Sequence, residues 1–189
     1  MIHDLKKYLM ATLCFFVSAL AFAEDLNSTR SYPLPDHGRI ELSIPTSWQE
    51  KVRQPPNNFP PTIIFTPQAG TAFKVLLTPM WHMSKEVAMP KIENLKEEVE
   101  YAAENVKSRS VEESIPIKEI KGIEGTGYYF SATDRAPKKG EFKYSTQGLL
   151  PIGELMAVFT VLSNDSEDGA NSDALAMLAS AIHVKDAAP

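Results

Sequence analysis

The chain has 189 residues, of which 43% are hydrophobic and 23% charged, and its formal net charge at pH 7 is −5. This balance excludes a disordered chain, and the acidic excess argues against a nucleic-acid binder that relies on positive charge. A single cysteine excludes an internal disulfide and a cysteine-based zinc site. The length fits one domain with a core of its own.

The first predicted element is a secretory signal peptide over residues 1–23. Lys6 and Lys7 provide its positive start, an uncharged apolar stretch follows, and Ala21 and Ala23 are the small residues of a cleavage site. The apolar stretch is shorter than the roughly 20 residues that a membrane-spanning helix needs; an uncleaved membrane anchor is the alternative. We therefore predict a secreted or periplasmic protein with no stable membrane span after cleavage. Its mature chain would contain no cysteine, because the only one lies in this segment.

Residues 24–37 are polar and contain two prolines, which predicts a polar N-terminal arm ahead of a single α+β domain over residues 38–186. Strands are expected where apolar and β-branched residues alternate or follow one another. The segments with this pattern are 40–44, 62–66, 73–78, 115–120, 128–131, 141–146 and 155–162. We expect 128–131 and 141–146 to form a hairpin, and 155–162 to be a central strand because it is apolar on both faces.

Two helices are expected in the second half of the chain. In residues 91–108, apolar side chains recur at steps of three and four residues, which places them on one face of a helix. Residues 172–182 show the same spacing near the end of the chain. Strands outnumber the helices that would connect parallel strands, so we predict an antiparallel α+β fold with helices packed on the sheet.

Three features of the chain resemble the PsbP-like superfamily. The first is the segment from Gly38 to Trp48, GRIELSIPTSW, a strand followed by a proline, a turn of small residues and a tryptophan. The others are the order of elements around residues 91–108 and the closing run, in which residues 155–162 lead into the final helix. The superfamily includes an extrinsic subunit of photosystem II, a Ran-binding nuclear import factor and DcrB-type secreted bacterial proteins.

The resemblance implies an antiparallel β-sheet flanked by helices in an αβα sandwich. It supplies no catalytic motif, because the superfamily shares none, and its members mostly bind proteins or act as accessory factors. A fold supports a function only by analogy. The leading hypothesis is a non-enzymatic accessory or binding protein that recognises a protein or an envelope component, with no cofactor and no nucleic-acid partner.

The most distinctive local cluster is Met80, Trp81, His82 and Met83. Thioethers and imidazoles suit Cu(I) or Ag(I), and an adjacent indole can cap such an ion through a cation–π contact. In an extended strand, alternate side chains point to opposite faces, so the four converge only if the chain turns here. The cluster predicts either a periplasmic carrier of a soft metal or small ligand, or a tryptophan and a methionine that fill core space while the histidine is exposed.

Other chemistry has less support in the sequence. His37, His82 and His183 are far apart and lack the spacing of zinc hydrolases. No Gly-x-Ser-x-Gly motif occurs. A hydrolase whose site is assembled from distant residues is the remaining enzymatic alternative.

Two loops are candidate contact regions for a partner. Residues 134–140 form a basic loop on an acidic protein, with Arg135, Lys138 and Lys139 at its tip. Residues 54–61 are rich in proline and contain Phe59. Loops carry binding residues disproportionately often, although a charged hairpin end also serves simply to discourage edge pairing.

Overall fold

The computed structural model describes residues 26–82, 90–165 and 169–186. The predicted signal peptide, residues 1–23, and one member of the candidate metal cluster, Met83, therefore lie outside the described residues. Within the three described ranges, no helix is long and apolar enough to cross a membrane.

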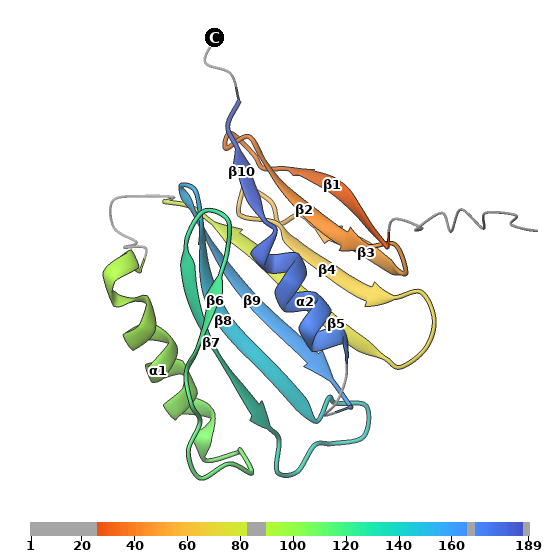
Figure 1. Cartoon of the computed structure of the whole chain (residues 1–189), viewed down its shortest axis with the longest axis vertical. Helices are drawn as coiled ribbons and strands as arrows, with labels where there is room; N and C mark the ends of the chain where they lie inside the picture. Colours follow the sequence, from red (N-terminus) through yellow and green to blue (C-terminus); the bar gives the residue numbers. More distant parts are fainter. Residues whose placement is uncertain (1–25, 83–89, 166–168, 187–189) are drawn as a thin grey trace, which may run out of the picture.

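Seven strands form one antiparallel sheet in the order β3-β4-β5-β9-β8-β7-β6 (Figure 1). Their bounds are β3 Trp48–Arg53, β4 Thr62–Pro67, β5 Phe73–Met80, β6 Lys118–Lys121, β7 Thr126–Thr133, β8 Tyr144–Ile152 and β9 Leu155–Ser163. β9 pairs with β5 on one side and β8 on the other, as expected of a strand that is apolar on both faces. The expected hairpin is formed by β7 and β8, which pair from Thr133 and Tyr144 onward.

A second, three-stranded antiparallel sheet has the order β1-β2-β10. Its strands are β1 Asn27–Pro33, β2 Arg39–Pro45 and β10 Ile182–Val184. β1 lies within the segment predicted as a polar arm, yet it pairs with β2 along its whole length. The prediction missed it because Tyr32 is the only buried residue of β1, so its hydrogen bonds to β2, rather than an apolar face, define the strand.

The helices are η1 Ile92–Asn94, α1 Leu95–Lys107 and α2 Gly169–Ala179. The first two fall within the helix expected over residues 91–108. α2 begins and ends three residues earlier than expected. The Ser180 hydroxyl donates to the carbonyl of Met177 at 2.6 Å where the helix ends. Ile182, expected in the helix, lies in β10 opposite Glu41 of β2, where the sheet provides its backbone with partners.

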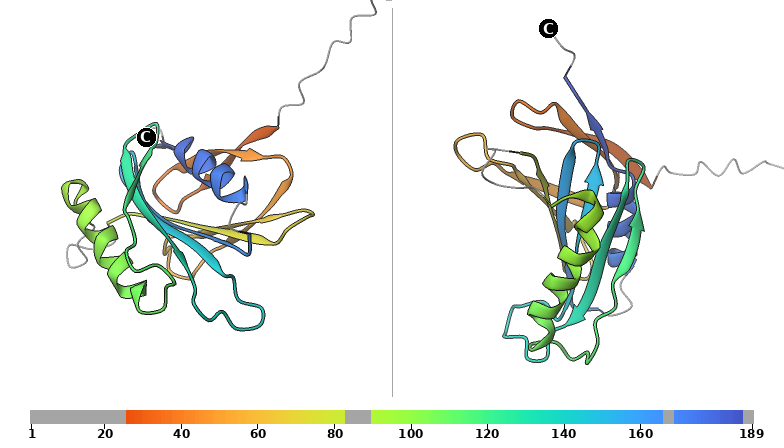
Figure 2. Two further views of the ribbon diagram at one scale, coloured as in Figure 1. Left: turned by 60° about the horizontal axis from the view of Figure 1, so that its bottom comes forward. Right: turned by 90° about the vertical axis from the view of Figure 1, so that its left-hand side faces the viewer.

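The expected αβα sandwich is wrong. Strands make up 46% of the structure and helices 18%, and a second sheet takes the place of a helical layer. We call the face of the seven-stranded sheet that carries α1 the outer face and the opposite one, which carries α2 and the three-stranded sheet, the inner face (Figure 2). α1, which continues directly from η1, is the only described α-helix on the outer face, and it packs over β7 and β8. The fold is therefore β-rich, with one helix on part of the outer face.

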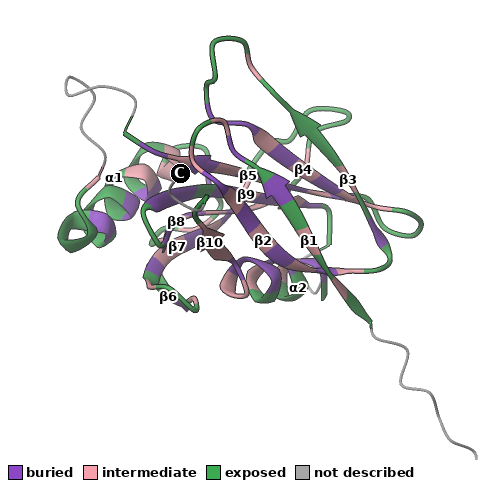
Figure 3. Ribbon diagram, turned by 90° about the horizontal axis from the view of Figure 1, so that it is seen from above, coloured by how far each residue is buried: buried purple, intermediate pink, exposed green. Residues whose placement is uncertain are grey.

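The main core lies between the inner face, α2 and the three-stranded sheet. Phe65, Leu77 and Phe159 of the large sheet and Ile40 and Leu42 of β2 are almost completely buried in it. A fully buried side chain of this size stabilises the fold by about 1.5–3 kcal/mol. A smaller cluster joins α1 to β7. Figure 3 shows this distribution, with buried positions along the central strands and a largely exposed α1.

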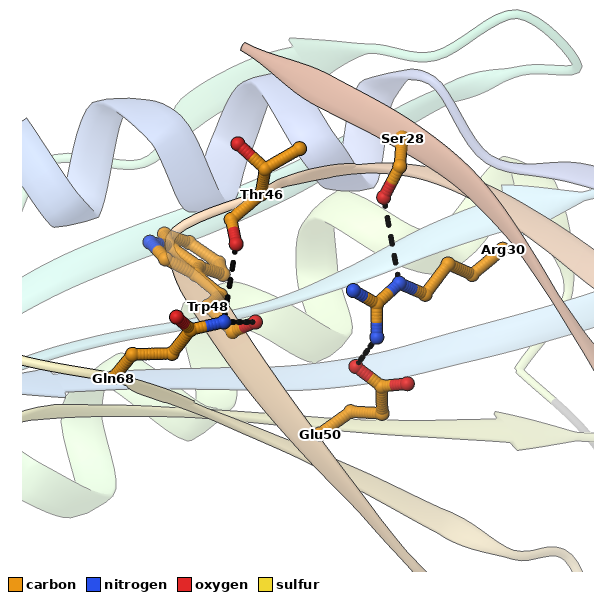
Figure 4. Close-up of polar contacts among 6 residues, drawn as sticks. All are labelled: Ser28, Arg30, Thr46, Trp48, Glu50 and Gln68. Carbon is orange, nitrogen blue, oxygen red and sulfur yellow. Dashed lines mark hydrogen bonds and ion pairs between the residues drawn. The ribbon is translucent and has the colours of Figure 1, made fainter.

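The two sheets are joined at the turn between β2 and β3 (Figure 4). The Gln68 amide donates to the carbonyls of Thr46 and Trp48, at 3.1 and 3.2 Å. Two residues beyond Trp48 on β3, Glu50 forms an ion pair with Arg30 of β1. These contacts satisfy backbone carbonyls at the corner and connect the edge strands of the two sheets.

Candidate functional site

Histidines from three distant parts of the chain meet at one end of the molecule. His37 lies in the turn between β1 and β2, His82 follows β5, and His183 lies in β10. His37 and His82 line the same pocket, which has a volume of about 440 Å³. His183 Nε2 lies 2.8 Å from the backbone carbonyl of His37. We call this cavity the histidine pocket.

Trp81 forms one wall of the histidine pocket and is buried at the end of β5. Its indole stacks on the His37 imidazole, with the ring centroids 4.4 Å apart and the planes 23° from parallel. Apolar side chains, among them Ile92 at the start of η1 and Leu155 of β9, line the pocket as well. The site therefore combines aromatic and apolar walls with a small number of polar groups, as ligand pockets commonly do.

The turn that carries His37 is held in one conformation. Nδ1 of His37 lies 2.8 Å from the carbonyl of Pro35. A carbonyl only accepts hydrogen bonds, so Nδ1 carries the proton and Nε2 of the neutral ring keeps its lone pair. Gly38 follows with φ 71°, and a Cβ there would lie 2.2 Å from the carbonyl of Val184. Glycine is therefore required for β10 to approach the turn.

Two carboxylates lie beside these histidines. Glu124 accepts a hydrogen bond from the backbone N–H of His183 at 2.7 Å. Glu154, which lines the pocket, pairs with Lys185 at 2.6 Å. The hydrogen bond and the charge of the Lys185 ammonium lower the pKa of Glu154 below its ordinary value, and positive charge on His183 or His37 acts in the same direction. Both carboxylates thus already have partners, and no group of three His, Cys, Asp or Glu among the described residues is arranged to hold a metal ion.

Of the three described members of the Met80–Met83 cluster, Trp81 and His82 line the histidine pocket and Met80 does not. The chain leaves the sheet after Met80, so Trp81 and His82 line one pocket instead of pointing to opposite faces. Met80 stays on the sheet, directly opposite Met156 of β9. Met156 is buried and lines the histidine pocket. Sequence reasoning missed Met156 because it lies inside an apolar run, and only the assembled structure places it in the pocket lining.

The proline-rich loop with Phe59 lies at the same end of the molecule, since it joins β3 to β4 next to the β1–β2 turn. The Asn58 amide donates to Asp36 in that turn at 3.3 Å. Gln54 donates to the carbonyl of Phe59 at 2.9 Å, while the Phe59 side chain is 45% exposed. A hollow of about 490 Å³ lies between this loop and residues 33–35. Phe59 and the histidine pocket thus belong to one end of the protein.

The basic loop lies at the opposite end, because it joins β7 to β8, whereas the pocket lies by the turn between β8 and β9. Arg135 is engaged within the protein: its guanidinium donates to the carbonyl of Ser110 at 2.7 Å. Lys138 and Lys139 are exposed, and neither forms an ion pair with another described residue. The two predicted contact regions therefore do not form one surface.

Comparison of the sequence with protein-family models gave no match, and comparison with curated proteins gave no significant match. The resemblance to the PsbP-like superfamily therefore stays a prediction. What the site can do follows from its own geometry: it offers a concave, mostly apolar pocket with two imidazoles, a thioether and an indole at its walls.

Proposed function

We propose that this is a secreted or periplasmic, non-enzymatic binding protein that recognises a protein or envelope component with the end that carries the histidine pocket. One observation carries the proposal: the β1–β2 turn, the proline-rich loop, the end of β5 and the β8–β9 turn, which are remote in sequence, meet there around two hollows. Concave apolar sites with a few placed polar groups are the usual form of binding sites.

The proline-rich loop supports a recognition role. Its prolines restrict the backbone, and the hydrogen bonds made by Gln54 and Asn58 hold it in place. A loop that is ordered before binding loses little conformational entropy when a partner docks. The exposed ring of Phe59 is the kind of aromatic anchor that contributes most of the binding energy in protein interfaces.

The pocket's chemistry supports binding rather than catalysis. Among the described residues that line it, none is a serine, threonine or cysteine that a histidine could activate as a nucleophile. Its carboxylate, Glu154, pairs with Lys185 and is solvent-exposed, so it lacks the raised pKa of a general acid. The alternative of a hydrolase assembled from distant residues gains no observation in its favour.

Site-specific photo-crosslinking in envelope extract of the native host tests the proposal. A photoreactive phenylalanine analogue replaces Phe59 in one variant and Lys138, at the opposite end, in a matched control. We expect a discrete crosslinked species from position 59 that is absent from position 138. Crosslinks from position 138 alone, or none from either position, would contradict recognition by this end.

A further inference from the structure

We propose that the histidine pocket binds one soft monovalent metal ion, Cu(I) or Ag(I), through Nε2 of His37, the imidazole of His82 and the thioether of Met156, beside the indole of Trp81. This site goes beyond the proposed recognition of a partner. It rests on the walls of the pocket, whereas the recognition test rests on Phe59 outside it.

His37 is arranged as a metal-ligating histidine usually is. Histidines that bind metals commonly donate their other ring N–H to a backbone carbonyl or carboxylate, which fixes the tautomer and the direction of the ring. His37 makes this bond from Nδ1 to Pro35 at 2.8 Å, and stacking on Trp81 holds the ring. The nitrogen left with a lone pair is Nε2, on a ring that lines the pocket.

His82 and Met156 complete a soft ligand set. Both line the same pocket as His37, although they come from the segment after β5 and from β9. Thioether sulfur favours Cu(I) and Ag(I), whereas Mg²⁺ and Ca²⁺ are held by oxygen ligands. Two imidazoles and a thioether therefore suit a soft ion better than magnesium or calcium.

The surroundings also favour a singly charged ion. Pro151 and Leu155 give the pocket buried apolar walls, which disfavour a strongly hydrated dication. Ile92 and Glu154 also line it but are exposed, and the Glu154 carboxylate is paired with Lys185. The indole of Trp81 lines the same pocket and stacks on His37, and a cation–π contact to an indole is worth more when the cation is desolvated. Trp81 would therefore report directly on occupancy of the site.

Titration with Ag(I), a stable probe for a soft monovalent ion, tests the inference. The background is Trp48→Phe, which leaves Trp81 as the only tryptophan among the described residues. Calorimetry and tryptophan emission are followed together in chloride-free buffer. We expect one equivalent to bind with a dissociation constant of about 1 μM or tighter, with quenching of the Trp81 emission.

Paired variants assign the ligands. His37→Phe keeps an aromatic ring to stack on Trp81 but removes Nε2, and Met156→Leu keeps the volume but removes the sulfur. Met177→Leu is the matched control, because Met177 is equally buried but lies in α2, away from the pocket. We expect His37→Phe and Met156→Leu each to weaken Ag(I) binding at least tenfold, and Met177→Leu to leave it unchanged.

Each of three results would overturn the inference: no saturable Ag(I) binding, binding that His37→Phe and Met156→Leu leave unchanged, or an equal loss in Met177→Leu. Zn(II) binding with the same affinity and the same dependence on His37 would also contradict the inference, because the site would then not prefer a soft ion. A failed titration leaves the crosslink at position 59 as an independent result, so the two proposals can fail separately.

Discussion

His183 donates a hydrogen bond from Nε2 to the backbone carbonyl of His37 at 2.8 Å, across 146 residues of sequence. The donor is the ring nitrogen, because a carbonyl only accepts. The backbone N–H of His183 is held in turn by Glu124. This hydrogen bond holds the β1–β2 turn, which carries His37, against β10. The shape of the histidine pocket therefore depends on it.

Replacing His183 by alanine should lower the free energy of unfolding by about 1–2 kcal/mol, because the His37 carbonyl loses its partner. Chemical denaturation monitored by circular dichroism measures the change. His82→Ala is the control: His82 is exposed, and a substitution at such a position changes stability by less than about 0.5 kcal/mol. Equal losses in the two variants would show that the bond of His183 does not hold the turn.

Gly148 should tolerate no side chain. A Cβ at this position of β8 would lie 2.4 Å from the carbonyl of Tyr128 and 2.6 Å from the ring of Phe159. Gly148→Ala should therefore cost about 2–4 kcal/mol, because the paired strands or the core must shift. Thermal and urea unfolding measure the loss.

Gly169 provides the matched control for that substitution. A Cβ at Gly169, the first residue of α2, would meet nothing within 4 Å. Gly169→Ala should leave the stability unchanged or raise it by up to about 1 kcal/mol, since alanine favours a helix more than glycine does. A loss in Gly169→Ala comparable to that in Gly148→Ala would contradict the steric argument.

Glu112 should make stability depend on pH in the acid range. Burial by itself would raise the pKa of its carboxyl, but hydrogen bonds from the Ser110 hydroxyl and from the hydroxyl and N–H of Thr133 lower it to about 2. Because this pKa lies below the ordinary value of 4.5, the contribution is complete above pH 4.5 and is lost as the pH falls toward 2.

The comparison of wild type with Glu112→Gln tests this direction. At pH 7 the variant should be less stable by about 2 kcal/mol, the size expected for hydrogen bonds to a charged group. The difference should shrink steadily below pH 4.5. Glu113→Gln, at an exposed neighbouring position, should change stability by less than about 0.5 kcal/mol. A difference for Glu112→Gln that stays constant from pH 7 to pH 3 would contradict the prediction.

The ion pair of Arg30 with Glu50 should couple the two sheets weakly. Both side chains are partly exposed, so a double-mutant cycle with Arg30→Met and Glu50→Gln should give a coupling of about 0.5–1 kcal/mol that decreases in 1 M salt. The more exposed pair of Lys91 and Glu93 should give a coupling near zero. A coupling of Arg30 with Glu50 that is insensitive to salt would contradict a solvent-screened pair.

The sequence predicted local elements well and their assembly poorly. Alternation of apolar and polar residues predicted β2, and a strand that is apolar on both faces was correctly expected at the centre of a sheet. β1, β3 and β10 escaped detection, because β1 and β3 each have a single buried residue and β10 is only three residues long. The αβα sandwich, which the resemblance to the PsbP-like superfamily implied, placed a layer of helices where the structure has a second sheet.

In the candidate site too, the sequence indicated individual residues but not which of them come together. Trp81 and His82 stood out by residue type, and they do line a pocket. His37 and Met156 carried no such signal, because the turn that holds His37 and the strand that holds Met156 reach the pocket only through long-range contacts. Phe59 and the basic loop looked equivalent in sequence, yet they lie at opposite ends of the large sheet.

By itself, the sequence predicted most of the strands and both α-helices, because side-chain period, turn residues and residue types are local properties. The tertiary structure alone decided which segments meet. β10 reaches β2 across more than 130 residues, and no local pattern encodes that contact. Because the histidine pocket is built from such long-range pairings, its composition became visible only once the sheets were assembled.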